Sequence, residues 1–382
     1  METIVASLKQ PVTHMYHTIS KDNNMVIIAI TLGLAMMISI IVVIWIWKTI
    51  TLKSTNCKHI DSLYSSLPAG FTHMNTNHEN YKHKLRDYYI KTAYNCCATG
   101  TYRSDFVDLC ALKNCIKQGV RCLDFEIYSE NNKPVISVSA TNDIHVKGSY
   151  NSIPFSDALN LINNQAFGGN SKCPNPKDPL IINLRIMSKN SAIYKEMTKD
   201  IYNTIEDKLL NKNYSYDDQD GNICNIPVAD IMGKIVIIVD KTHALLEETS
   251  LDEYINLSSK NEYFNCMRSS EFNDIHNVDT LKEFNKTGMT ICMPDVGTSP
   301  NNPPVNIAKA YGCQLIAMAF QNNDSNLEYY NSIFSSAGSA FILKPAILRF
   351  IPKKYTPPPL PDKSLSYEPR NFSVGTKDIF NN

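Results

Sequence analysis

The segment QGVRCLDFEIY, Gln118–Tyr128, decides the fold and points to the site. Its apolar and aromatic residues predict a β-strand, in which successive side chains point to opposite faces. Asp124 and Glu126 are two residues apart and therefore lie on the same face. Two carboxylates that point in one direction indicate either a cation site or an ion pair with a basic neighbour.

Short β-rich runs recur on both sides of this strand, and segments with helical periodicity, such as Phe155–Asn164 and Ile193–Leu210, lie between them. Runs such as KIVIIV are apolar on both faces, as is typical of a covered parallel sheet. Eight strands that alternate with helices predict a (β/α)8 TIM-type barrel, with its site at the C-terminal strand ends. The predicted strands are Tyr88–Ala93, Cys122–Tyr128, Pro134–Val138, Leu180–Met187, Lys234–Val239, Met289–Met293, Gln314–Phe320 and Ala340–Leu343.

The first strand motif resembles GxRCxExD, which belongs to the X half of phosphoinositide-specific phospholipase C. Two later segments, YGCQLIAMAFQ (Tyr311–Gln321) and SAFILKPAILR (Ser339–Arg349), are similar to GCQxVALNFQ and GYVLKPxxLR of the Y half. The resemblance covers roughly residues 85–350 and implies a phospholipase-type barrel.

The resemblance also implies a mechanism with two histidines and a calcium ion. In the segment KTAYNCC, Tyr94 stands in place of the family's first histidine, and Asn95 matches a metal-binding asparagine. A phenol ordinarily has a pKa near 10 and is a poor general base at neutral pH. Asp124 and Glu126 match the two acids that bind calcium, with the two side-chain lengths exchanged.

The remaining family positions are altered as well. The second histidine falls on Val138 when counted along KPVISV and on His145 when counted back from IPFSDAL, so His145 is a weak catalytic candidate. Arg185 replaces the last metal-binding glutamate, and we expect it to pair with Asp124 or Glu126. GKIVIIVDK leaves only Lys241 near the positions of the phosphate-binding lysines. We therefore expect Asn95, Asp124 and Glu126 to be a vestigial metal site without calcium or another cofactor.

Composition excludes some classes of protein. Lys and Arg together number 37, as do Asp and Glu, and this balance predicts no nucleic-acid partner. The 11 cysteines form no recognisable disulfide framework or zinc motif, so we expect mainly buried thiols. Asn-x-Ser/Thr sequons occur at Asn213, Asn256, Asn285, Asn323 and Asn371, but asparagine is so frequent that about this number is expected by chance.

The segment Met25–Trp47 has no charged residue and is long enough to cross a hydrocarbon core of about 30 Å, so it predicts a single transmembrane helix. The lysines that follow it weakly favour a cytoplasmic barrel. We divide the rest of the chain into an N-terminal segment (1–24), a polar tether (48–84), the barrel (85–350) and a Pro-rich tail (351–382). Within the tail, KKYTPPPLPD (Lys353–Asp362) predicts a stiff spacer or a ligand for a protein partner.

These features predict a membrane-anchored phospholipase C-like barrel that has lost phosphoinositide hydrolysis and serves as a binding or structural module for membrane lipid. Such reduced, anchored versions are similar to phospholipase-like proteins of large DNA viruses, which implies a virion or host-derived internal membrane. The alternative is an active phosphoric diester hydrolase. Metal-independent bacterial relatives carry an arginine at the calcium position, and Arg185 with His145 would then support cleavage.

Overall fold

The computed structural model describes residues 2–65, 71–144, 146–168, 172–216, 222–246, 249–259, 261–275, 277–352, 371–374 and 377–380. His145 and the segment Lys353–Asp362 lie outside the described residues. The chain divides into two compact units at Arg349. In the second unit, β12 (Asn371–Val374) pairs with β13 (Lys377–Phe380) in an antiparallel ladder.

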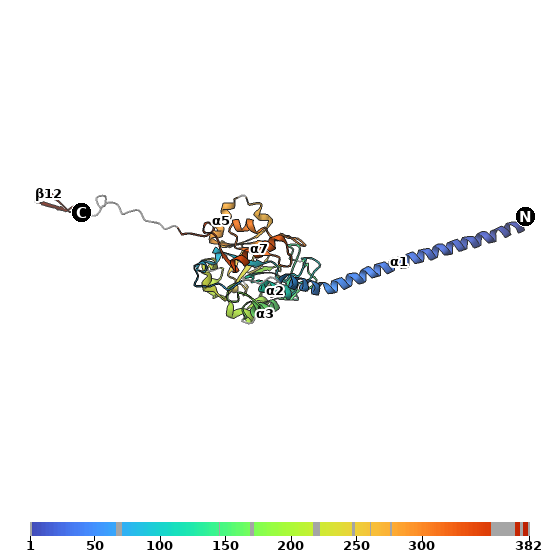
Figure 1. Ribbon diagram of the computed structural model, residues 1–382, viewed down its shortest axis with the longest axis horizontal. Helices are drawn as coiled ribbons and strands as arrows, with labels where there is room; N and C mark the ends of the chain where they lie inside the picture. The colour runs from blue at the N-terminus through green and yellow to red at the C-terminus, as the bar shows by residue number, and fades with distance from the viewer. Residues whose placement is uncertain are drawn as a thin grey trace. The chain divides into compact units, whose positions relative to one another are not determined.

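Eight parallel strands form a nearly closed barrel in the first unit, in the order β7-β6-β5-β2-β1-β10-β9-β8. Among the described residues no ladder joins β7 to β8. The strands are β1 (Tyr88–Ala93), β2 (Cys122–Glu130), β5 (Leu180–Ile186), β6 (Ile235–Asp240), β7 (Leu257–Ser258), β8 (Phe264–Arg268), β9 (Met289–Met293) and β10 (Leu315–Met318). Helices surround these strands (Figure 1): α2 (Leu109–Lys117), α3 (Phe155–Ala166), α4 (Ser191–Ile205), α5 (Val278–Thr287), α6 (Val305–Ala310) and α7 (Ser325–Ala337).

The predicted barrel is confirmed, and all eight predicted runs contain strands, but two of these strands are not part of the barrel. Pro134–Val138 corresponds to β3 (Lys133–Ser137), which is antiparallel to β2 and pairs with β4 (Ile153–Pro154). Ala340–Leu343 corresponds to β11 (Phe341–Leu343), which is antiparallel to β1. The missing barrel strands are β7, which has only two residues, and β8, whose sequence FNCMR mixes polar and apolar residues. Neither has the apolar pattern that the other barrel strands show.

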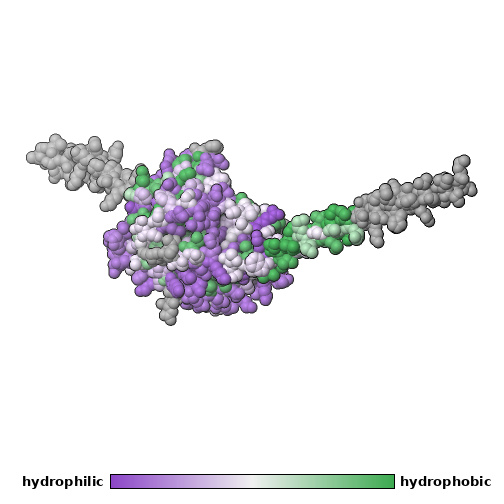
Figure 2. Space-filling model, turned by 45° about the vertical axis from the view of Figure 1, so that its right-hand side comes forward, coloured by the Kyte–Doolittle hydropathy of each residue, from purple (hydrophilic) through white to green (hydrophobic). Residues whose placement is uncertain are grey.

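A long helix, α1 (Glu2–Ser65), precedes the barrel and contains the predicted transmembrane segment. The side chains of Met25–Trp47 are almost all exposed and form a continuous hydrophobic surface, whereas the barrel surface is mainly hydrophilic (Figure 2). By length and composition this segment is a candidate membrane span.

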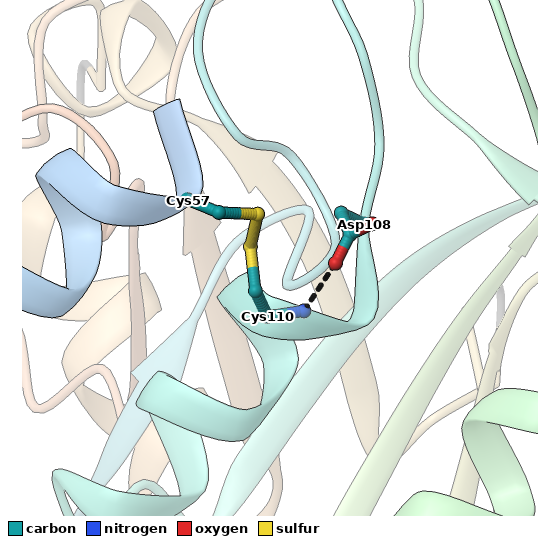
Figure 3. A group of neighbouring side chains, drawn as sticks. All are labelled: Cys57, Asp108 and Cys110. Carbon is teal, nitrogen blue, oxygen red and sulfur yellow. Dashed lines mark hydrogen bonds between the residues drawn. A yellow bond between two sulfur atoms is a disulfide. The ribbon is translucent and has the colours of Figure 1, made fainter. Parts of the chain in front are cut away.

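Residues 48–84 are not the polar tether that the sequence predicts. The helix continues to Ser65, and Cys57 forms a disulfide with Cys110 at the start of α2 (Figure 3). Ile60 and Tyr64 are buried in the barrel core, as are Phe71 and Met74 farther along. Ile60 and Tyr64 are four residues apart and share one face of the helix, so a narrow apolar stripe is enough to dock a mostly polar segment.

This docked segment also covers a buried lysine. Lys91 on β1 is 1% exposed, and its Nζ donates to the Gln118 carbonyl at 2.9 Å. The Nζ atom lies 4.5 Å from the centre of the Phe71 ring. Burial lowers the pKa of Lys91 to about 7. Residues 71–74 are therefore part of the folded unit, and their packing affects the charge state of the core.

Candidate functional site

Strands β1, β2 and β5 bring the predicted site residues together at the end of the barrel that is formed by the C-terminal ends of the parallel strands, which we call the mouth. In the parallel β2–β5 register, Glu126 is opposite Arg185 and Asp124 is opposite Asn183. Asn95 follows the end of β1. Its φ of 44° lies in the left-handed region, which asparagine tolerates better than most residues. This conformation accompanies a hydrogen bond in which the Asn95 backbone N–H donates to Asp124 Oδ2 at 3.0 Å.

The Arg185 guanidinium occupies the centre of this group. Its Nε and Nη2 donate to the two oxygens of Asp124 at 3.0 and 2.8 Å. Its Nη1 donates to Glu126 Oε1 at 2.5 Å, and Nη2 also donates to Asn95 Oδ1 at 2.7 Å. The side chains of Arg185, Asp124 and Glu126 are 4%, 0% and 3% exposed. The predicted ion pairing of Arg185 with the two acids is therefore confirmed, and the cluster is fully buried.

The remaining capacity of the two carboxylates is also used. Asn183 Nδ2 donates to Asp124 Oδ1 at 2.7 Å, and the Ser139 backbone N–H donates to Glu126 Oε2 at 2.9 Å. Burial alone would lower the pKa of Arg185, but the carboxylates of Asp124 and Glu126 raise it well above its ordinary value. A calcium ion needs six to eight oxygen ligands. Calcium does not fit here, because a permanent cation already holds these oxygens.

Tyr94 lies against the same guanidinium, with the Arg185 Cζ atom 4.6 Å from the centre of its ring. Its hydroxyl accepts a hydrogen bond at 3.0 Å from Nη1 of Arg268, which ends β8. Tyr94 is thus a stacking surface that connects two arginines. This arrangement offers no proton acceptor comparable to a histidine.

Above the cluster lies a cavity of about 220 Å³, lined by Asn142, Arg185, Met187, Asp240, Thr242, His243, Cys266, Met267, Arg268, Glu271 and Met293. Arg268 donates to neutral oxygens, namely Tyr94 Oη, the Pro294 carbonyl and Asn142 Oδ1, each at 3.0 Å. Among the described ion pairs none includes Arg268, so its charge is available to an anionic ligand. Sequence reasoning missed Arg268 because strand β8 was not predicted.

Asp240 and His243 enter the same cavity from the end of β6. Burial would raise the pKa of Asp240, but hydrogen bonds from Thr242 and Ser259 lower it below its ordinary value, so the carboxylate is charged at neutral pH. His243 was also missed, although it follows Lys241 by only two residues. The cavity therefore combines two acids, two arginines and a histidine.

Other predicted residues are not brought to this cavity. Lys241 donates from Nζ to Tyr216 Oη at 3.1 Å and lies over that ring, and it does not line the cavity. Val138, one of the two positions for the second histidine, is a buried apolar residue. The other, His145, lies outside the described residues, so its role stays a prediction.

Within the part of the chain that the structure describes, one further cluster contains metal-binding residue types. Cys57, Asp108 and Cys110 place potential ligand atoms within 4.8 Å of one another. The two sulfurs are bonded to each other, and Asp108 pairs with Lys53 at 2.7 Å. This cluster is therefore a disulfide beside an ion pair, and it has no free thiolate that could bind a metal.

Comparisons with known proteins agree with this geometry. Residues 81–241 match the family described as Phosphatidylinositol-specific phospholipase C, X domain. Among solved structures, PLC21 of S. officinalis is 19% identical over 72% of this chain, with a TM-score of 0.57. PLC21 of L. pealei is 17% identical over 71% of this chain, with a TM-score of 0.55. The alignments cover 39% and 38% of those two chains, and no curated protein sequence matches.

The structural likeness shows the barrel fold, and the X-domain match covers the strands that carry Asp124, Glu126 and Arg185. The chain therefore carries a match to this X domain over residues 81–241, within a barrel whose fold is similar to that of the two PLC21 structures.

Proposed function

We propose that this chain is a membrane-anchored phospholipase C-like barrel that no longer hydrolyses phosphoinositides and acts as a binding or structural module at its membrane. The observation that carries this proposal is the position of Arg185, whose guanidinium fills the space between Asp124, Glu126 and Asn95. A site without a metal loses the Lewis acid that would stabilise charge on the reacting phosphate.

Two other features support the loss of activity. Tyr94 holds the position of the family's first histidine, and its hydroxyl is engaged with Arg268. The loss of a general base typically reduces the rate by about 10²–10⁴-fold. Lys241 contacts Tyr216 and does not contribute to a phosphate clamp in the cavity.

The cavity still suits an anionic, polar ligand, and we take the headgroup of a membrane phospholipid as its occupant. Arg268 supplies a cation, while Asp240 and Glu271 offer acceptors for hydroxyl groups. Binding without cleavage would make the barrel a lipid-recognising module. Protection of the full chain against thermal unfolding by inositol 1-phosphate, lost in Arg268→Gln, would support this role. Equal protection of both proteins would exclude the cavity as the binding site.

The decisive experiment measures inositol phosphate release by the full chain in vesicles that contain phosphatidylinositol, with calcium or with chelator. We expect no release in either condition and no calcium binding by calorimetry. Tyr94→His combined with Arg185→Glu should regain calcium binding without regaining turnover, because the second histidine is not restored. Calcium-dependent release that Asp124→Asn abolishes would show that the chain is a working enzyme.

The second candidate function is metal-independent cleavage of a phosphodiester. It is favoured by one observation, that His243 lines the same cavity as Arg185 and Arg268. In that case His243 would act as the base and Arg268 would bind the phosphate. Release of inositol phosphate that resists chelator and disappears in His243→Gln would identify this activity. Full release by His243→Gln would exclude His243 as the base.

The membrane is proposed from α1 and from the resemblance to viral proteins, so a virion or host-derived internal membrane is the expected location. The Cys57–Cys110 disulfide favours an oxidising compartment for the barrel, contrary to the orientation that the flanking lysines weakly favour. Protease protection of the barrel in sealed vesicles distinguishes the two orientations. Blocking of free thiols followed by a non-reducing gel shows whether the Cys57–Cys110 disulfide is formed. A protein partner of the Pro-rich tail remains a proposal that rests on the sequence KKYTPPPLPD alone.

A further inference from the structure

The docked part of α1 runs alongside α2 in the same direction. Lys53 pairs with Asp108, the N-cap of α2, at 2.7 Å. Cys57 is bonded to Cys110 in the first turn of α2 (Figure 3), and Asp61 accepts a hydrogen bond from Asn114 one turn later. Successive residues of α1 therefore contact successive residues of α2 in the same chain direction, so the two helices are parallel.

The direction of α2 fixes the direction of α1 relative to the barrel. Strand β1 ends at the mouth of the barrel, and α2 begins after the loop that follows it, so the N-terminus of α2 lies at the mouth. The ring of Phe71, beyond the end of α1, lies beside Gly119 at the opposite end of α2, because a Cβ at position 119 would come within 2.9 Å of it. The part of α1 that precedes Lys53, including the apolar segment, therefore extends outward from the mouth side.

The distance from this segment to the mouth is short. Trp47 ends the apolar segment six residues before Lys53, which corresponds to about 9 Å along a helix at 1.5 Å per residue. The headgroup layer on each side of a bilayer is about 5–8 Å thick. Loops that project from the mouth will therefore reach the headgroup layer if α1 crosses the bilayer steeply.

Three loops at the mouth carry exposed apolar side chains. Val146 follows β3, Leu245 follows β6 and Val296 follows β9, and their exposed fractions are 46%, 48% and 43%. Each lies within four residues of a residue that lines the cavity, namely Asn142, His243 or Met293, so all three lie near the cavity on the side from which α1 extends. Apolar side chains around a polar cavity suit contact with a lipid surface.

We infer that the α1–α2 pair, joined by the Cys57–Cys110 disulfide, holds the mouth of the barrel against the bilayer that α1 crosses, with Val146, Leu245 and Val296 in contact with lipid. This inference rests on the proposed membrane anchoring. In this orientation the cavity faces lipids of the membrane that α1 crosses. Lipid binding in the cavity then depends on the length of α1 between Trp47 and Lys53.

Introduced tryptophans test this orientation in the full chain. The two native tryptophans are first removed by Trp45→Phe and Trp47→Phe, and Leu245→Trp or Val296→Trp is then added. The control is Ile347→Trp, because Ile347 is 79% exposed and lies near the opposite end of the barrel, where the Lys344 N–H donates to the Asp87 carbonyl before β1. Emission is compared in phosphatidylcholine nanodiscs with and without bromine near the headgroup end of the acyl chains.

We expect brominated lipid to quench the tryptophans at positions 245 and 296 and to leave the one at position 347 unchanged. A seven-residue helical insert of Glu and Lys after Lys48 moves the barrel about 10 Å away from the bilayer. It adds nearly two whole turns, so the barrel keeps nearly the same rotation about the helix axis, and the quenching should be abolished. Quenching at position 347 that equals or exceeds the other two, or no quenching at any site, would overturn the orientation. Release of the chain from membranes by carbonate would instead show that the anchoring itself fails.

Discussion

Replacement of Arg185 by methionine should destabilise the protein strongly. Asp124 and Glu126 have side chains that are 0% and 3% exposed, and Arg185 is their shared cation. Removal of one partner from a buried ion pair costs about 3–5 kcal/mol, because the surviving charge is left without compensation. At roughly 2–4 °C per kcal/mol, the Tm of Arg185→Met should fall on the order of 10 °C.

Thermal unfolding of the full chain in mild detergent, followed by circular dichroism, measures this effect. A matched control is Lys147→Met, which breaks a partly exposed pair with Glu130 and should cost at most about 1 kcal/mol. Asp124→Asn with Glu126→Gln, added to Arg185→Met, should recover much of the lost stability. An unchanged Tm in Arg185→Met, or a triple variant no more stable than the single one, would refute the reasoning.

Three further predictions follow from the rest of the molecule. The full chain should remain with membranes after carbonate extraction, and its appearance in the supernatant would contradict a span at Met25–Trp47. A fragment that starts at residue 49 should fold, whereas one that starts at residue 85 should melt at a lower temperature or aggregate, because it loses the Cys57–Cys110 disulfide and the core residues Ile60, Tyr64 and Phe71. Equal Tm values would contradict this packing. The folded-state pKa of Lys91, about 7, lies below its unfolded value, so the unfolded chain binds more protons and stability should rise with pH between about 7 and 10. Lys91→Met should reduce this rise by about 1 kcal/mol per pH unit in urea unfolding, and an identical pH dependence in both proteins would show that Lys91 is not buried as a neutral amine.

Local patterns in the sequence predict much of the barrel and of its central ion cluster. Strand β1 has the predicted bounds because its run is rich in aromatic and β-branched residues, and β2 fixes Asp124 and Glu126 on one face by alternation. The pairing with Arg185 is predictable because each residue has a defined position in its own motif. The parallel pairing of β2 with β5 then places Glu126 opposite Arg185. Strands β7 and β8 depend on neighbours for their pairing, and a two-residue strand has no pattern to read.

The sequence by itself determines a candidate membrane span, a parallel barrel and an arginine in place of a metal ligand, because each rests on periodicity or on residue identity within one segment. Only the tertiary structure decides that Ile60, Tyr64, Phe71 and Met74 belong to the core, since the disulfide joins positions 53 residues apart and Ile60 and Tyr64 have no partner until α2 is in place. The same holds for the cavity, where β5, β6 and β8 bring Arg185, His243 and Arg268 together. Contacts between distant segments depend on how the barrel closes, and no local pattern encodes that closure.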